Sequence, residues 1–80
     1  MRELYWLSFA DKDKFRGVAM VYAEDFVGAV RTSIVQGCNA GPDTSVEGST
    51  IPADYHIPQE FIGRLLSKED IDQLYAQDNV

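Results

Sequence analysis

The first 23 residues consist of two apolar runs separated by a charged turn. Leu4 to Phe9 is almost entirely apolar and aromatic, and Arg16 to Ala23 repeats this character beyond the charged residues. Aromatic and β-branched residues favour strands, so the pattern predicts a β-hairpin over residues 1–23. Both faces of the first strand are apolar, which is typical of a strand that is covered on both sides.

The next apolar positions recur at helical spacing and predict a helix over residues 24–37. Glu24 and Asp25 suit the positive end of its dipole, and Gly37 suits the left-handed position that ends a helix. One face of this helix comprises Phe26, Ala29, Val30, Ser33 and Ile34, and Val27 lies at its edge.

Turn-forming residues follow and predict a loop over residues 38–57. A short strand at 46–51 fits within this loop, although Gly48 interrupts it and Pro52 ends it.

Two short C-terminal helices are expected, at 58–66 and at 68–76. Pro58 suits the first turn of a helix, and apolar residues follow it at helical spacing. Ser67 and Asp70 form a variant of the capping box in which Asp replaces the usual Glu or Gln, with Leu66 and Ile71 at the positions of a hydrophobic staple.

The predicted order is therefore β-β-α-(β)-α-α, a small α+β fold in one domain covering residues 1–80. We expect an antiparallel sheet of two to three strands packed on a helix. A right-handed crossover would place the first strand between the other two. The helix would cover one face of the sheet, and the C-terminal helices an edge or the other face.

Charge restricts the classes of partner. The chain has 7 basic and 13 acidic residues, a net charge of −6, and the whole excess lies in residues 41–80. Because nucleic acid and anionic membranes attract basic surfaces, we expect neither direct nucleic-acid binding nor membrane association. A single cysteine, Cys38, and the absence of a signal-peptide pattern favour a cytoplasmic protein.

No pattern assigns catalytic chemistry, so the sequence predicts a protein that is not an enzyme and needs no cofactor or metal. Cys38 and His56 have no spacing that supports a nucleophile and base, and no third residue orients them. Asp11 to Asp13 begins like a calcium loop, but Phe15 and Arg16 break the EF-hand pattern.

A protein-binding module is the expected function, with an acidic surface that meets a basic one. In small size and acidity the chain resembles phage-encoded inhibitors such as anti-CRISPR proteins, which implies occlusion of a nucleic-acid-binding surface of a partner. The alternatives are a self-associating accessory domain that dimerises through a sheet edge, a small-ligand-binding module, and carboxylates that serve only solubility. The candidate partner-binding residues are Asp54, Tyr55, Glu60, Glu69, Asp70, Asp72 and Tyr75.

Overall fold

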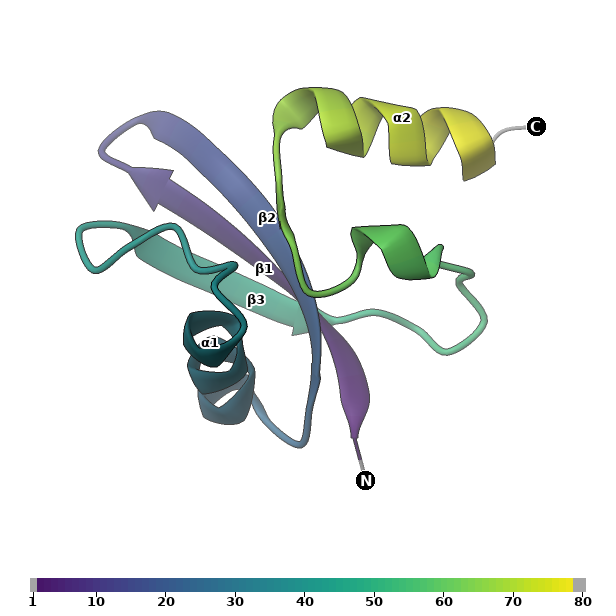
Figure 1. The fold of residues 1–80 in the computed structure, drawn as a ribbon, viewed down its shortest axis with the longest axis horizontal. Coiled ribbons are helices and arrows are strands. Elements are labelled where there is room, and N and C mark those ends of the chain that lie inside the picture. The colour runs from purple at the N-terminus through teal and green to yellow at the C-terminus, as the bar shows by residue number, and fades with distance from the viewer. Residues whose placement is uncertain (1, 79–80) are drawn as a thin grey trace.

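The computed structural model describes residues 2–78 and shows an α+β fold (Figure 1). One antiparallel sheet contains four strands in the order β3-β1-β2-β4. In the described range no helix has the length and apolar character needed to cross a bilayer. The elements are β1 (Glu3–Asp11), β2 (Lys14–Ala23), α1 (Phe26–Val35), β3 (Ser45–Thr50), the 3-10 helix η1 (Gln59–Phe61), β4 (Leu65–Leu66) and α2 (Lys68–Asp78).

The predicted hairpin is confirmed, with β1 and β2 paired from Glu3 and Ala23 to Asp11 and Lys14. An irregularity in the register near the turn coincides with Gly17, whose φ of 139° is unfavourable for residues with a side chain. A Cβ atom at Gly17 would lie only 3.0 Å from the carbonyl oxygen of Leu66. The glycine therefore lets β4 approach β2 closely.

The two faces of the hairpin are both covered, as the apolar character of both faces of the first strand predicts. On one face β1 and β2 pack against α1, and on the other they pack against η1 and α2, with the Leu66 side chain of the neighbouring strand β4, so the sheet separates two small cores. Figure 1 shows α1 and α2 on opposite sides of the β1–β2 hairpin. The buried residues of the first core are Tyr5, Leu7, Phe9, Ala19, Val21, Ala23, Ala29 and Cys38. Those of the second core are Val18, Met20, Phe61, Leu66 and Leu74.

Helix α1 lies within the predicted range and has well-formed ends. The Asp25 side chain accepts a hydrogen bond of 2.7 Å from the Gly28 N–H at the first turn. Gly37 has a φ of 74°, and the N–H groups of Gly37 and Cys38 donate to the carbonyls of Ile34 and Ser33. This pair of bonds is the Schellman arrangement that glycine favours after a helix.

The expected third strand is present as β3, shifted by one residue from the prediction. It pairs antiparallel with β1, which therefore lies between β2 and β3 as the crossover argument predicts.

The predicted helix over residues 58–66 is wrong. Only Gln59–Phe61 is helical, as a single 3-10 turn, and Gly63 then adopts a left-handed φ of 78°. The Gly63 N–H donates to the Met20 carbonyl over 2.8 Å, and β4 pairs with Val18 and Ala19. Backbone groups that would have been paired within a helix are paired with β2 instead. The sheet therefore has four strands, whereas two to three were expected.

Helix α2 begins as predicted and extends two residues further. The Ser67 Oγ accepts the Asp70 N–H over 3.2 Å, while the Asp70 carboxylate accepts the Ser67 N–H over 3.0 Å. Leu66 and Ile71 contribute to the same core, in the positions of the predicted staple.

Candidate protein-binding site

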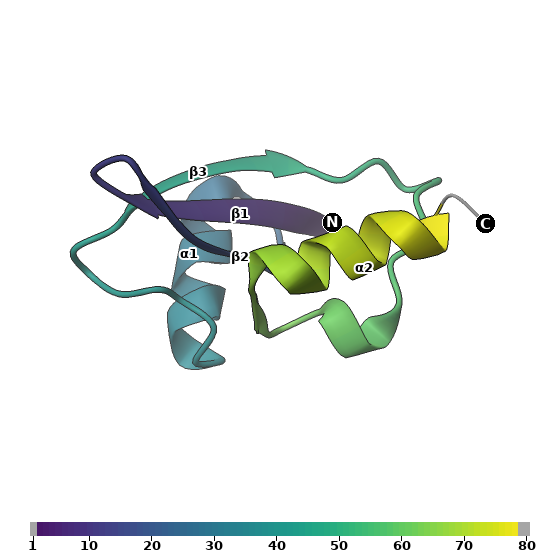
Figure 2. The same cartoon turned by 90° about the horizontal axis from the view of Figure 1, so that it is seen from above.

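The candidate partner-binding residues come from three neighbouring parts of the fold. Asp54 and Tyr55 lie between β3 and η1, Glu60 lies on η1, and the other four lie on α2. Figures 1 and 2 both show α2, η1 and this connecting segment gathered at one end of the molecule.

The two tyrosines of the candidate set meet in one groove of about 310 Å³. Tyr55 is 57% exposed and Tyr75 is 56% exposed, although each contributes to the groove wall. We name this feature the tyrosine groove. Its lining residues are Trp6, Ser49, Thr50, Ile51, Pro52, Tyr55, His56, Ile57, Leu74 and Tyr75.

The position of Tyr75 follows from the periodicity of α2. Leu74 is buried against the sheet, so its neighbour Tyr75 falls on the border between the buried and exposed sides of the helix. A tyrosine at such a border presents a broad apolar ring and a polar hydroxyl, a combination that is enriched at protein interfaces.

Two exposed carboxylates are neighbours of the groove tyrosines. Asp54 precedes Tyr55 in the chain, and Asp72 lies one helical turn before Tyr75 on α2. Residues three apart on a helix are surface neighbours, so Asp72 and Tyr75 present a carboxylate and a ring side by side. No lysine or arginine lines the groove in the described part of the chain.

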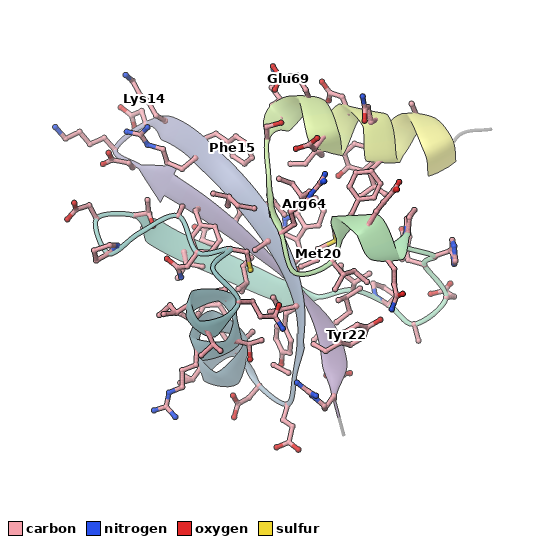
Figure 3. All side chains as sticks on the ribbon, in the orientation of Figure 1. Lys14, Phe15, Met20, Tyr22, Arg64 and Glu69 are labelled. Atoms are coloured by element: carbon pink, nitrogen blue, oxygen red, sulfur yellow. The ribbon has the colours of Figure 1, made fainter. Side chains whose placement is uncertain are left out.

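Asp70 has a structural role. Hydrogen bonds from the Ser67 N–H and hydroxyl, with a smaller contribution from the Arg64 guanidinium 3.7 Å away, hold the pKa of Asp70 below its usual value. Arg64 also lies 5.8 Å from the centre of the Phe61 ring. Figure 3 shows Glu69 projecting outward from the first turn of α2, with Arg64 on the inner side of the helix.

The acidic residues of the second half do not belong to one structural element. Asp43 lies in the turn before β3, Glu47 lies on β3, and Glu60 lies on η1. Of the candidate residues, Tyr55 and Tyr75 line the tyrosine groove and the five carboxylates do not, although Asp54 neighbours Tyr55 in the chain and Asp72 neighbours Tyr75 on α2.

Cys38 and His56 lie in different parts of the fold. The Cys38 thiol is buried in the core beneath α1, and burial raises its pKa, which disfavours the reactive thiolate. His56 is exposed and lines the tyrosine groove on the other side of the sheet.

At the hairpin turn, where the sequence begins like a calcium loop, the Asp11 carboxylate accepts a hydrogen bond of 3.0 Å from the Arg16 guanidinium.

Sequence reasoning missed Trp6 and His56 as groove residues. Alternation along β1 places Trp6 on the face away from α1, where it packs against the second core, but only the fold shows that residues 49–57 and α2 leave it partly exposed there. His56 carries no local signal, because its position depends on the path of the loop after β3.

No family model, curated protein or solved structure matches this chain. The tyrosine groove and the charges around it are therefore the basis for a functional proposal.

Proposed function

We propose that this chain is a non-enzymatic, acidic protein-binding module that binds a basic surface of a partner protein through the tyrosine groove. The observation that carries the proposal is the convergence of two half-exposed tyrosines from separate parts of the fold on one groove, each with an exposed carboxylate, Asp54 or Asp72, as its neighbour.

The chemistry of the groove suits a cationic side chain with an apolar stem. A guanidinium or ammonium group is attracted to the face of an aromatic ring, by about 0.5–2 kcal/mol depending on its desolvation. Asp54 and Asp72, the neighbours of the two tyrosines, would add long-range attraction, which mainly increases the association rate. The net charge of −6 likewise favours attraction between this chain and a basic partner.

The narrower form of the proposal is an inhibitor that covers a nucleic-acid-binding surface in the cytoplasm. Its support is the combination of small size and acidity that resembles the anti-CRISPR class of phage inhibitors. The buried free thiol of Cys38 is compatible with a reducing compartment.

Selection of peptides from a random display library on the immobilised protein tests the general proposal. We expect the selected peptides to combine arginine or lysine with apolar residues, and their affinity to fall as ionic strength rises. The double substitution Asp54→Lys and Asp72→Lys should weaken binding about tenfold or more, because it replaces attraction by repulsion beside the two tyrosines.

The matched control is the double substitution Asp13→Lys and Glu24→Lys, which changes net charge equally at exposed positions outside the groove. If both double substitutions weakened binding equally, the effect would come from overall charge, and the assignment of the tyrosine groove as the binding site would be overturned. Selected peptides without basic residues, or binding that is insensitive to salt, would contradict the proposal and favour an apolar-peptide or small-ligand site instead.

A further inference from the structure

Strand β3 forms an open edge of the sheet. It pairs with β1 on one side, and it is the terminal strand in the order β3-β1-β2-β4. The opposite edge differs, because β4 covers part of β2 and the Gly63 N–H binds the Met20 carbonyl beside it.

The hydrogen-bonding groups that β3 leaves free follow from the alternation of an antiparallel ladder. The Ile51 N–H donates to the Leu4 carbonyl over 2.8 Å, so Ile51 faces β1 with its backbone groups. The alternate residues Val46, Gly48 and Thr50 must then direct their N–H and C=O groups away from β1. No backbone hydrogen bond from the other loops and turns of the described chain reaches these three residues.

The two sides of this edge differ in chemistry. On the α1 side, a Cβ atom at Gly48 would lie only 2.7 Å from the Phe26 ring, so the ring covers the glycine, and Phe26 itself is 38% exposed. On the other side, β3 presents Ser45, Glu47 and Ser49, all of them exposed. An added strand would therefore meet an aromatic ring on one face and a carboxylate with two hydroxyl groups on the other.

The free edge is continuous with the tyrosine groove, because Ser49, Thr50 and Ile51 belong to the groove lining. A segment running along β3 would reach the groove at the carboxyl end of the strand. Glu47 and Trp6 both lie on the face of the sheet opposite α1, so the carboxylate and the groove are on the same side of such a segment.

We infer that β3 receives an extended segment of the partner as a fifth strand, in a sequence that alternates apolar and basic residues. The apolar side chains would contact Phe26 across Gly48, and the basic ones would lie beside Glu47 and lead into the groove. Main-chain hydrogen bonds to Val46, Gly48 and Thr50 would supply affinity, as in other cases of strand addition. This inference rests on the proposed function and specifies how the partner binds.

Charge disfavours a second copy of this chain as the occupant. Each copy carries a net charge of −6. In a symmetric antiparallel pairing centred on Gly48, the two Glu47 side chains would be diagonal neighbours on one face, where like charges repel. A basic segment would be attracted both by the net negative charge of the chain and by Glu47.

Nuclear magnetic resonance titration with a synthetic peptide of alternating lysine and valine tests the inference. We expect shifts in the amide signals of Val46, Gly48 and Thr50, and slower hydrogen exchange at these amides in the complex. The control peptide carries N-methyl groups on the backbone nitrogens of its valines, which face β3 when the valine side chains contact Phe26. It keeps the charge but loses strand pairing, so it should bind at least about fivefold more weakly.

Two variants of the full chain test the edge. Thr50→Pro removes an outward N–H without touching the ladder to β1 and should weaken peptide binding. Because Thr50 also lines the groove, Glu47→Lys, at a residue outside the groove lining, provides the independent test, with Asp13→Lys as its control for overall charge.

The outcomes distinguish the two proposals. Binding that requires Asp54 and Asp72 but tolerates Thr50→Pro and backbone methylation would overturn strand addition and leave the groove proposal standing. Loss of binding in the groove variants and in the edge variants supports both proposals. No binding of the lysine–valine peptide, or self-association of the protein through β3 in its absence, would overturn the inference.

Discussion

At the scale of single residues, Gly48 shows how a weak strand signal can reflect a packing requirement. Glycine interrupts the apolar pattern of residues 46–51 and lowers the strand tendency of the segment. In the fold, the missing side chain makes room for Phe26 and Leu7, which would lie 2.7 and 2.8 Å from a Cβ atom at this position. The residue that weakens the strand in the sequence thus lets α1 pack on the sheet edge.

Gly48→Ala should destabilise the protein. Removing a glycine from a strand gains about 0.4–1 kcal/mol through the unfolded state, but overpacking of a close contact costs about 1–3 kcal/mol. Leu7 is fully buried and cannot move away easily, so the overpacking should dominate. We expect a net loss of about 1 kcal/mol and a melting temperature lower by roughly 4–8 °C, measured by circular dichroism.

A double-mutant cycle with Phe26→Leu provides the control, because the smaller side chain relieves one of the two contacts. The two substitutions should then be less destabilising together than the sum of their separate effects. A rise in melting temperature for Gly48→Ala alone would show that Phe26 does not pack tightly against Gly48.

At the scale of elements, α2 depends on the reciprocal bonds between Ser67 and Asp70 at its amino end. These bonds, more than the Arg64 charge, lower the pKa of Asp70 in the folded state. The ionised carboxylate therefore stabilises the fold above the ordinary aspartate pKa of about 4, and this stabilisation disappears as the pH falls through the lower pKa of the folded state.

Asp70→Asn should reduce stability most near neutral pH, because the amide keeps the shape of the side chain but not its charge. The difference from the natural protein should shrink as the pH falls below about 4. Urea unfolding at a series of pH values measures this difference. Asp72→Asn, which alters an exposed carboxylate outside the cap, should change stability little, and a difference for Asp70→Asn that does not vary with pH would refute the role of its charge.

At the scale of the whole molecule, the excess of carboxylates outweighs the attractive pairs. Only two ion pairs occur among the described side chains, Arg16–Asp11 and Arg64–Asp70, and both are partly exposed. Exposed pairs of this kind contribute little. Repulsion within a chain of net charge −6 should therefore be the larger electrostatic effect on stability.

We expect the melting temperature to rise as sodium chloride increases from about 0.01 M to about 0.3 M, since the screening length falls from roughly 30 Å to below 10 Å. Differential scanning calorimetry measures the change. A comparison of chloride with sulfate at equal ionic strength separates screening from the stabilising effect of sulfate on apolar burial. A melting temperature that falls with added chloride would mean that attractive pairs dominate.

Prediction from sequence succeeded where the signal is local. The hairpin, α1 with Asp25 and Gly37 at its ends, and the cap of α2 follow from periodicity and from side chains that bond within a few residues. Prediction failed at residues 58–66, where the spacing of Phe61, Leu65 and Leu66 fits a helix. There, bonds to β2, more than forty residues earlier, decide the conformation, and Gly63 permits the turn that they require.

The sequence by itself determined the α+β class, the order of β1, β2 and β3, and the location of the negative charge in residues 41–80, because each depends on alternation, handedness or composition. Tertiary structure alone decided that Tyr55 and Tyr75 share a groove with Trp6 and that β3 has a free edge. These features depend on contacts between residues distant in the chain, whose positions no local pattern encodes.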